Sequence, residues 1–364
     1  MSPRSEKIDN NSSGDILISR FSALGDVAMT LAPIYDACLS NPSRRFILLT
    51  RCHPASLFIN PPANLVIHPI DTSDYHGLGG LRRLHRELRK AYDITAYADL
   101  HDVLRTQILR LLFRLQGGVR IAKVDKGRAA RRRLTRKLRK HLVPLTPMSE
   151  RYADTLAAVG APGAGKFTSI FPDKGRDSRT PGKKEEAGEY KVAIAPFAAH
   201  EGKIYPYDLM EKVIAELISH PEVKIYIFGF GDKEKAIIEQ WRSNLSEDQS
   251  ERVINMAAEK SGLPAELALI SECDVMLSMD SANMHLASLA GTRTVSIWGA
   301  THPYCGFRPR NVSDHDILQL DMTCRPCSVF GNKKCHRGDY HCLRGISPRR
   351  IVDVVLGVKG KALS

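Results

Sequence analysis

The segment from residue 275 to residue 299, VMLSMDSANMHLASLAGTRTVSIWG, constrains the fold more than any other part of the chain. Its apolar run 275–279 ends in a polar cluster that begins at Asp280. A short amphipathic stretch follows, stops at Gly291 and leads into a second β-branched run. This order predicts a strand, a tight turn, a helix and another strand, which is half of a βαβ unit. Open α/β sheets bind ligands at the carboxyl ends of such strands, where a helix N-terminus also favours phosphate. The alternative is that the polar cluster only caps the helix.

The same alternation of strands and helices occupies both halves of the chain. In the first half the apolar and periodic runs lie at residues 15–19, 27–39, 44–50, 65–70, 81–91 and 93–100. In the second half they lie at 191–197, 207–220, 224–230, 253–257 and 263–273. Alternating elements of this size are typical of parallel sheets covered by helices. Because 364 residues are too many for one ordinary core, we expect two Rossmann-like domains with a cleft between them.

Composition shifts along the chain predict the domain boundaries. Residues 1–14 are polar and are expected to be disordered, and residues 15–171 form the first domain. The stretch 172–190, PDKGRDSRTPGKKEEAGEY, is rich in Pro, Gly and charge and is the predicted linker. Residues 191–345 form the second domain. The segment 346–364 is predicted to be a helix that packs back on the first domain.

The charge of the chain indicates an acidic partner. Its formal net charge is +13, which favours nucleic acid, an anionic lipid or a phosphorylated substrate. Residues 120–142 hold eleven Lys and Arg against one Asp. A solvated helix face is the ordinary explanation of a charge run, but an excess of one sign favours a landing surface for an anionic partner. The stretch contains no aromatic residue, which disfavours a base-stacking platform for single strands.

The apolar residues do not form any long run. The longest fall short of the 18 or so residues that a spanning helix needs, and the N-terminus has no apolar signal region. We therefore expect a cytoplasmic protein.

Four of the eight cysteines fall within one short stretch, CRPCSVFGNKKCHRGDYHC. In a reducing compartment they are expected to be thiols or metal ligands. Four thiolates in one loop can hold a tetrahedral structural zinc, with His336 and His341 as alternative ligands. Reduced thiols that pack in the core, or a redox pair, are the alternatives. The candidate zinc ligands are Cys324, Cys327, Cys335 and Cys342.

Two motifs, RFSALGDVAMTLAPI and SMDSANMHLASLAGTRTVSIWGATHP, resemble the paired signatures of the heptosyltransferase family, glycosyltransferase family 9. With a single Lys loop between them, they cover the chain from about residue 15 to 345. The resemblance implies a GT-B fold, in which two Rossmann-like domains with parallel sheets face a central cleft. It also implies inverting transfer of a sugar, heptose from ADP-heptose, to the inner core of lipopolysaccharide or lipooligosaccharide. No metal or other cofactor is expected for catalysis.

The resemblance also assigns candidate residues in the first motif and in the Lys loop. Asp26 matches the base that would take the proton of the acceptor hydroxyl, and a helix start favours its ionised form. The alternative is that Asp26 only caps or orients the helix. Lys203 matches the family's Lys, which would neutralise the donor phosphate as the leaving group departs; otherwise it is a surface Lys.

The second motif matches the donor-binding loop of the family. Its residues include Ser281, whose hydroxyl and the amides after it would hold the diphosphate. Asp280 is expected to order the loop or to bind a sugar hydroxyl. Members of the family often have Gly where this chain has Ala282. Because of this difference, a nucleotide sugar other than ADP-heptose is an alternative donor. His285 is expected either to bind phosphate or to pack in the core. The full set of predicted donor contacts is Lys203, Asp280, Ser281, Asn283, Met284, His285, Asp232 and Glu234.

The basic residues then have a role at the acceptor. They would meet a lipid A-linked core and anionic lipid at the inner face of the cytoplasmic membrane, where the protein would be peripheral. Two other classes remain open: a nucleic-acid-binding α/β protein that uses residues 120–142, and a nucleotide-sugar epimerase of GT-B-like fold. Under the leading interpretation no nucleic acid is expected as a partner. The predicted acceptor contacts are Arg20, Ser22, Gly25, Arg105, Arg120, Arg131, Arg132 and Arg133.

Overall fold

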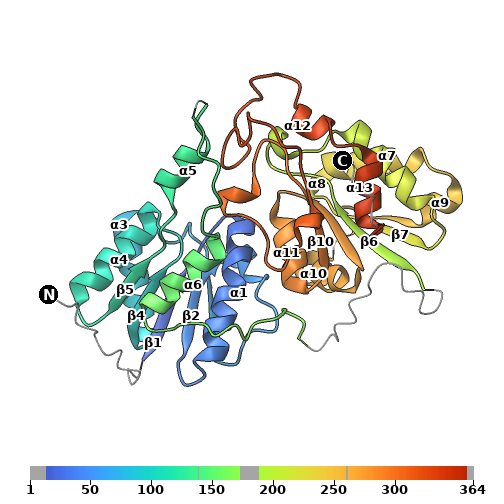
Figure 1. Cartoon of the computed structure of the whole chain (residues 1–364). Coiled ribbons are helices and arrows are strands. Elements are labelled where there is room, and N and C mark those ends of the chain that lie inside the picture. The colour runs from blue at the N-terminus through green and yellow to red at the C-terminus, as the bar shows by residue number, and fades with distance from the viewer. Residues whose placement is uncertain (1–13, 138, 173–187, 260, 359–364) are drawn as a thin grey trace. The chain divides into compact units, whose positions relative to one another are not determined.

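A computed structural model describes residues 14–137, 139–172, 188–259 and 261–358 (Figure 1). The chain divides into two compact units. The first contains Met1–Lys126 and Thr146–Thr168, and the second contains Gly127–Leu145 and Ser169–Ser364. Each unit is built around one parallel sheet, so the predicted α/β class with two Rossmann-like sheets is confirmed. Of the predicted disordered N-terminus and the predicted linker, residues 1–13 and 173–187 lie outside the described residues.

The sheet of the first unit has the strand order β3-β2-β1-β4-β5, and all four neighbouring pairs are parallel. Its central strands are buried along their length, which is why they read as continuous apolar runs. The strands are β1 (Asp15–Ser19), β2 (Phe46–Arg51), β3 (Leu65–Ile70), β4 (Ile94–Asp99) and β5 (Arg120–Lys123).

Helices cover both faces of this sheet. Helices α3 and α4 bury their apolar stripes together against Leu17, Ile47 and Tyr97, on one face. Helix α1 packs on α6, and right-handed crossovers place α1 on the other face. The helices of the first unit are α1 (Leu24–Ser40), α2 (Cys52–Ala55), α3 (Gly77–Ala91), α4 (Leu104–Gln116) and α6 (Met148–Ala158).

The sheet of the second unit has the order β11-β10-β9-β6-β7-β8 and is also parallel throughout. Its strands are β6 (Tyr190–Ala195), β7 (Val223–Ile227), β8 (Val253–Asn255), β9 (Val275–Met279), β10 (Arg293–Ile297) and β11 (Ile317–Leu318). Its longer helices are α7 (Tyr207–Ile218), α8 (Gly231–Ser243), α10 (Gly262–Glu272), α11 (Ala282–Ala290) and α13 (Pro348–Val355). Its short helices are α5 (Arg128–Leu134), α9 (Glu247–Glu251), α12 (His341–Arg344), η1 (Glu201–Lys203), η2 (Pro303–Cys305) and η3 (Asp314–Asp316).

The C-terminal helix α13 packs within the second unit, whereas the sequence favoured packing on the first domain. Ile351, Val352 and Val355 are buried in the same core as Val213 and Leu217 of α7. The reason is the apolar stripe of α13, which completes the core of the sheet that precedes it in the chain.

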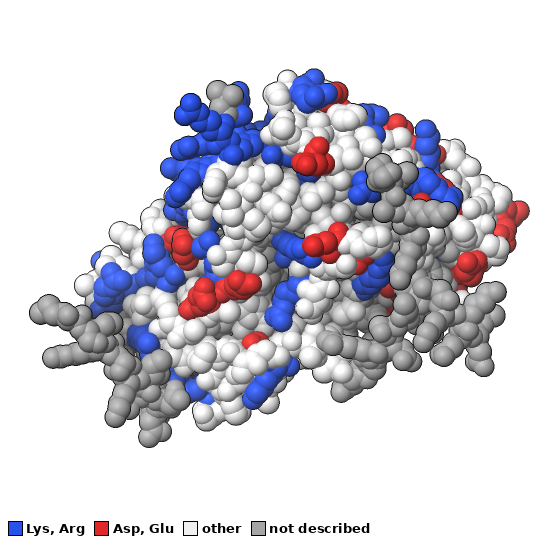
Figure 2. Space-filling view, viewed as in Figure 1, with Lys and Arg blue, Asp and Glu red and all other residues white. Residues whose placement is uncertain are grey.

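The basic stretch after β5 also differs from its predicted place. Residues 127–145 contact the second unit, although the sequence assigned them to the first domain 15–171. The Leu145 N–H donates to the Tyr304 carbonyl at 3.0 Å, and Lys140 donates to the Cys324 and Pro326 carbonyls. Figure 2 shows Lys and Arg side chains gathered over the region of α5. Among the described residues no helix is long and apolar enough to cross a membrane.

Candidate functional site

The predicted base, Asp26, lies in the first turn of α1, directly after the carboxyl end of β1. Its Oδ2 lies 2.6 Å from Nη2 of Arg20. The Asp26 side chain is 31% exposed, whereas Arg20 is only 5% exposed. A buried guanidinium therefore holds a carboxylate that solvent can still reach.

Arg20 is itself fixed by two other elements of the first unit. Its Nη1 donates to the Leu100 carbonyl at 2.8 Å, after β4, and to the Tyr152 hydroxyl at 3.3 Å, on α6. The guanidinium also lies over the Tyr152 ring at 5.8 Å. Three elements thus set the direction in which the Asp26 carboxylate points.

A second polar cluster ends β4, and sequence reasoning missed it. Asp99, which is fully buried, accepts hydrogen bonds from the N–H groups of His101 and Asp102, both at 2.9 Å. Arg110 of α4 pairs with Asp99 at 3.2 Å and with Asp102 at 3.0 Å. The signal in the sequence is the step from the apolar strand to Leu100-His101-Asp102, at the edge where parallel sheets place their sites.

His101 connects this cluster to the Arg20 loop. Its Nδ1 accepts the Phe21 N–H at 3.4 Å. Burial, followed by the charges of Arg20 and Lys126, lowers the pKa of His101 to about 3, so the ring is neutral at physiological pH. A neutral ring adds no second positive charge beside Arg20, so it does not repel the guanidinium that holds Asp26.

The remaining acceptor candidates fall in different places. In the first unit, Ser22 is half-buried and Gly25 lies in the first turn of α1. Arg105 donates to the Tyr75 carbonyl at 3.1 Å and so holds the turn before α3, and Arg120 is exposed on β5. In the second unit, Arg131 lies 4.6 Å over the Phe307 ring, and its neighbours on α5 are exposed. The two exposed neighbours are Arg132 and Arg133.

In the second unit, Lys203 and Asp280 form an ion pair. The Lys203 Nζ lies 2.9 Å from Asp280 Oδ2, and their side chains are 16% and 5% exposed. Asp280 directly follows β9, and η1, which contains Lys203, follows β6, the parallel neighbour of β9. Adjacent strand ends therefore bring together two residues that are far apart in the sequence.

Small residues allow this pair to form. A Cβ on Gly202 would lie 2.8 Å from the Ala300 Cβ, and a Cβ on Gly331 would lie 2.7 Å from Cγ of Lys203. The Ala300 N–H also donates to the Gly202 carbonyl at 2.8 Å. The loop after β10 thus packs directly on the backbone that carries Lys203.

Helix α11 begins beside this pair. Ser281 is its N-cap residue, but its side chain does not cap the helix and lies 3.3 Å from the Ser278 hydroxyl. Asn283 is half-buried in the first turn, whereas Met284 and His285 are 1% and 7% exposed. Burial at those two positions favours packing, which was one of the two alternatives for His285.

The acidic donor candidates lie farther along the same sheet edge, in the first turn of α8 after β7. The Glu234 Oε2 accepts the Phe230 N–H at 2.7 Å, so Glu234 closes the turn before α8. Asp232 is exposed. Neither residue contacts Lys203 or Asp280 through an interaction seen among the described residues.

The cysteine loop is organised around an arginine. All four of its cysteines are free thiols, and no group of three or more His, Cys, Asp or Glu among the described residues is placed to hold a metal ion. Burial raises the pKa of Cys342 to about 11, as for a packed thiol. Arg325 is 2% exposed and donates to the carbonyls of Trp298, Gly299, Thr301 and Leu320. The geometry of the described residues thus gives no support to the zinc hypothesis. It agrees with the alternative that the thiols are reduced and packed.

Replacing Arg325 with Met is expected to destabilise the second unit by roughly 3 to 5 kcal/mol, because several buried carbonyls lose their donor at once. Urea unfolding of the full chain measures the change. Arg337→Met is the matched control in the same loop, since Arg337 is about half exposed and pairs only with Asp339 among the described residues. Equal stabilities of the two variants would show that Arg325 does not organise the loop.

Acid is expected to destabilise the protein through buried neutral histidines. Burial, followed by the charge of Arg325, lowers the pKa of His302 to about 4, from a usual 6.5. Below about pH 6.5 the unfolded chain binds a proton that the folded chain does not, so stability decreases as the pH falls towards 4. The free energy of unfolding should fall by about 3 kcal/mol because of His302, since each unit of the pKa shift from 6.5 to about 4 corresponds to about 1.36 kcal/mol.

Urea unfolding across this pH range tests the prediction. His302 accepts the Tyr304 N–H at 3.1 Å as an N-cap, and His302→Asn keeps such an acceptor while removing the titration. The variant should show a flatter pH dependence, and exposed His315→Asn should not. A slope unchanged by His302→Asn would contradict the prediction.

Comparisons with known proteins give a consistent result. Residues 81–337 match the family model of glycosyltransferase family 9 (heptosyltransferase). A lipooligosaccharide heptosyltransferase 2 of Campylobacter jejuni is 27% identical over 129 residues, which are 35% of this chain and 39% of that protein. The chain therefore spans about two fifths of the length of this curated relative.

Solved structures share the fold over a longer stretch. The ADP-heptose lps heptosyltransferase II of E. coli has a TM-score of 0.66 at 17% identity, and the match covers 94% of this chain and 98% of that one. The E. coli heptosyltransferase WaaC with ADP has a TM-score of 0.58 at 16% identity, covering 82% and 92%.

Proposed function

Because the chain belongs to glycosyltransferase family 9, the heptosyltransferase family, we propose that it transfers a heptose from ADP-heptose to the inner core of lipopolysaccharide or lipooligosaccharide, with inversion at the anomeric carbon. The observation that carries the proposal is the Lys203–Asp280 pair beside the start of α11. A cation and free helix amides at one sheet edge suit a diphosphate. The names of the relatives from C. jejuni and E. coli support the sugar and the acceptor, and the ADP in one structure's name supports the nucleotide.

In this proposal the second unit binds the donor. Lys203 approaches the diphosphate and balances the charge that builds up on the leaving group, which lowers the barrier to bond cleavage. Asp280 holds the ammonium in place through its 2.9 Å contact, because a buried carboxylate so close to phosphate would be repelled as a direct ligand. The first-turn amides of α11, which the Ser281 side chain does not cap, are donors for the phosphate oxygens. Lys203 and these amides thus supply positive charge without a metal ion.

The first unit supplies the base. Asp26 accepts the proton of the attacking acceptor hydroxyl, and the new bond forms on the face of the sugar opposite the departing ADP. The contact with Arg20 fixes the direction of the Asp26 carboxylate, and the 31% exposure of its side chain leaves it accessible to an acceptor. The acceptor is anchored in a membrane by lipid A, so the enzyme works as a peripheral protein at the inner face of the cytoplasmic membrane.

A two-stage experiment tests the function. A thermal-shift panel of ADP-, UDP-, GDP- and CMP-sugars identifies the donor, and we expect the ADP-sugar to raise the melting temperature most. Mass spectrometry of a deacylated core acceptor then reports transfer of one heptose. If a different nucleotide sugar raised the melting temperature most, that sugar would be assigned as the donor in place of ADP-heptose. Donor binding without transfer to any core acceptor, or release of an epimerised nucleotide sugar, would overturn the proposal.

A further inference from the structure

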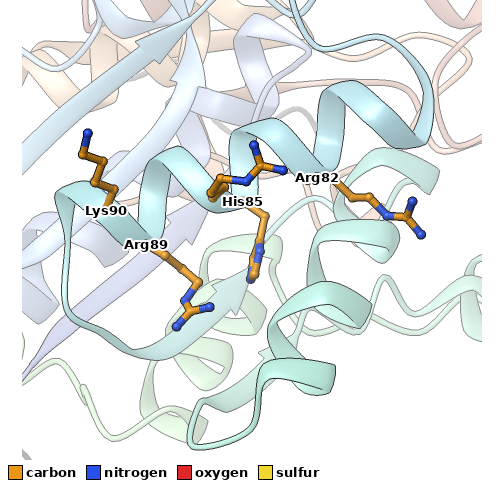
Figure 3. A pocket seen from close by; sticks show the side chains of 5 residues that line it. Arg82, His85, Arg89 and Lys90 are labelled. Carbon is orange, nitrogen blue, oxygen red and sulfur yellow. The ribbon is translucent and has the colours of Figure 1, made fainter.

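The solvent-facing surface of α3 and α4 carries a pattern that sugar transfer does not require. On α3, Arg82, His85, Arg86 and Arg89 follow the i, i+3, i+4, i+7 spacing of one helix side. With Lys90 they line an open hollow of about 450 Å³ (Figure 3). None of these residues belongs to the Asp26 cluster described above.

Helix α4 adds an exposed apolar stripe. Leu104, Leu111 and Leu115 are 73%, 52% and 75% exposed, at spacings of seven and four residues that place them on one side. The opposite side of α4 already fills the core with Leu109 and Phe113, so the stripe has no place in the first unit. Three leucines on one helix side form a patch, which single exposed leucines do not.

The two stripes belong to one surface. Helices α3 and α4 pack together on the same face of the sheet. His85 of α3 joins them, since its ring lies 4.5 Å from the Phe113 ring and its Nε2 lies 3.1 Å from Gln116 Oε1. Leu78, seven residues before His85 on α3, is 59% exposed and extends the apolar part. We call this surface the α3–α4 face; its residues are Leu78, Arg82, Arg86, Arg89, Lys90, Leu104, Leu111 and Leu115.

The charge of the α3–α4 face is not balanced locally. The face carries four exposed cations, Arg82, Arg86, Arg89 and Lys90, and the two helices hold one acidic residue, Glu87. Glu87 is engaged by the Tyr75 hydroxyl at 2.7 Å and by Arg83 at 3.7 Å. Within the described part of the chain, no acidic side chain pairs with the arginines that line the hollow. An anionic partner would therefore meet several uncompensated cations.

We propose that the α3–α4 face binds the surface of an anionic lipid bilayer. Arginines would contact the headgroup phosphates, and the exposed leucines would enter the boundary between headgroups and acyl chains. A soluble phosphate or a nucleic acid would use the charges but not the leucines, and an apolar protein groove would not need so many cations. This proposal depends on the proposed function in one respect: the proposed function explains why the enzyme must bind a membrane, where its lipid-anchored acceptor lies.

Vesicle sedimentation of the full chain tests this docking surface. We compare phosphatidylcholine vesicles with vesicles that also contain phosphatidylglycerol, at low and high salt. Arg82→Gln/Arg86→Gln/Arg89→Gln should lower partitioning onto anionic vesicles roughly tenfold or more. At high salt, where charge contacts are screened, Leu104→Gln/Leu111→Gln/Leu115→Gln should lower the remaining partitioning onto anionic vesicles roughly tenfold. Circular dichroism and thermal unfolding confirm that each variant is folded.

The matched control removes three exposed charges in the cysteine loop of the second unit: Lys333→Gln/Lys334→Gln/Arg337→Gln. It should change partitioning by less than about twofold, because these residues have no exposed leucine stripe beside them. Absence of wild-type binding, equal binding to neutral vesicles, an equal loss in the control, or binding unaffected by the leucine changes would each overturn the proposal. Binding of an RNA duplex but not of vesicles would instead assign the face to nucleic acid. Transfer to a deacylated, water-soluble acceptor is measured separately, so failure of the proposed function is distinguishable from failure of docking.

Discussion

Replacing Asp26 with Asn is expected to lower kcat for sugar transfer about 10³-fold, because the acceptor hydroxyl loses its general base. The affinity for the nucleotide sugar should stay unchanged, since the predicted donor contacts lie in the second unit. Asn is nearly the same size as Asp and can still accept a hydrogen bond from Arg20, so the loop keeps its shape. Single-turnover kinetics with saturating donor measure the change, and calorimetry measures donor binding.

Two control variants separate catalysis from folding. Asp36→Asn changes a second aspartate on the same helix, one that accepts the Gly165 and Phe167 N–H groups and holds the segment after α6. It should lower the unfolding free energy by about 1 to 3 kcal/mol and leave kcat unchanged. Asp26→Glu keeps a carboxylate and should recover part of the activity. If Asp26→Asn retained a normal kcat, another group would be the base.

The sequence alone predicts some strands with their bounds and part of the candidate site. The runs at 15–19 and 275–279 became β1 and β9 with unchanged bounds, because strands buried on both faces must be apolar along their whole length. The place of Lys203 and Asp280 at the same sheet edge also follows from the alternation of strands and helices. Their 2.9 Å contact does not, because it depends on how closely the loop after β10 packs at Gly202 and the loop after β11 packs on Lys203 at Gly331.

Other features had no local signal. A run of like charges does not indicate which core it contacts, so the attachment of residues 127–145 to the second unit could not be read from the sequence. It depends on contacts such as Lys140 with the Cys324 carbonyl, 184 positions away. The same holds for Arg325, because an arginine between two cysteines suggests a metal loop or a surface charge. Only burial identifies it as the donor to several carbonyls.

Asp99 and His101 show a further limit. Their polar side chains follow an apolar strand, as those of many loops do. Only the structure shows that Asp99 accepts two backbone N–H groups and pairs with Arg110. The predicted residues therefore carry the proposed chemistry, and the unpredicted ones hold the backbone around it. Roles that depend on burial cannot be assigned from residue type and spacing alone.

Replacing Lys203 with Met is expected to lower kcat by about 10² to 10³, because one preorganised positive group at the leaving diphosphate is removed. The donor dissociation constant should increase as well, since the same ammonium meets the ground-state phosphate. Lys224→Met is the matched control: Lys224 also pairs with a carboxylate, Glu189 at 3.3 Å, on β7 of the same sheet. It should leave both quantities unchanged.

The partner of Lys203 gives the sharper result. If Asp280 acts by holding Lys203, Asp280→Asn alone should lower kcat less than Lys203→Met does, and the double variant should be no slower than Lys203→Met. Independent roles, such as a direct contact of Asp280 with a sugar hydroxyl, would instead make the two losses multiply. The contact at 2.9 Å, with Asp280 only 5% exposed, favours the first outcome, because a buried carboxylate beside an ammonium has little surface left for a sugar. Multiplying losses would therefore move Asp280 from the positioning of Lys203 to the binding of the sugar.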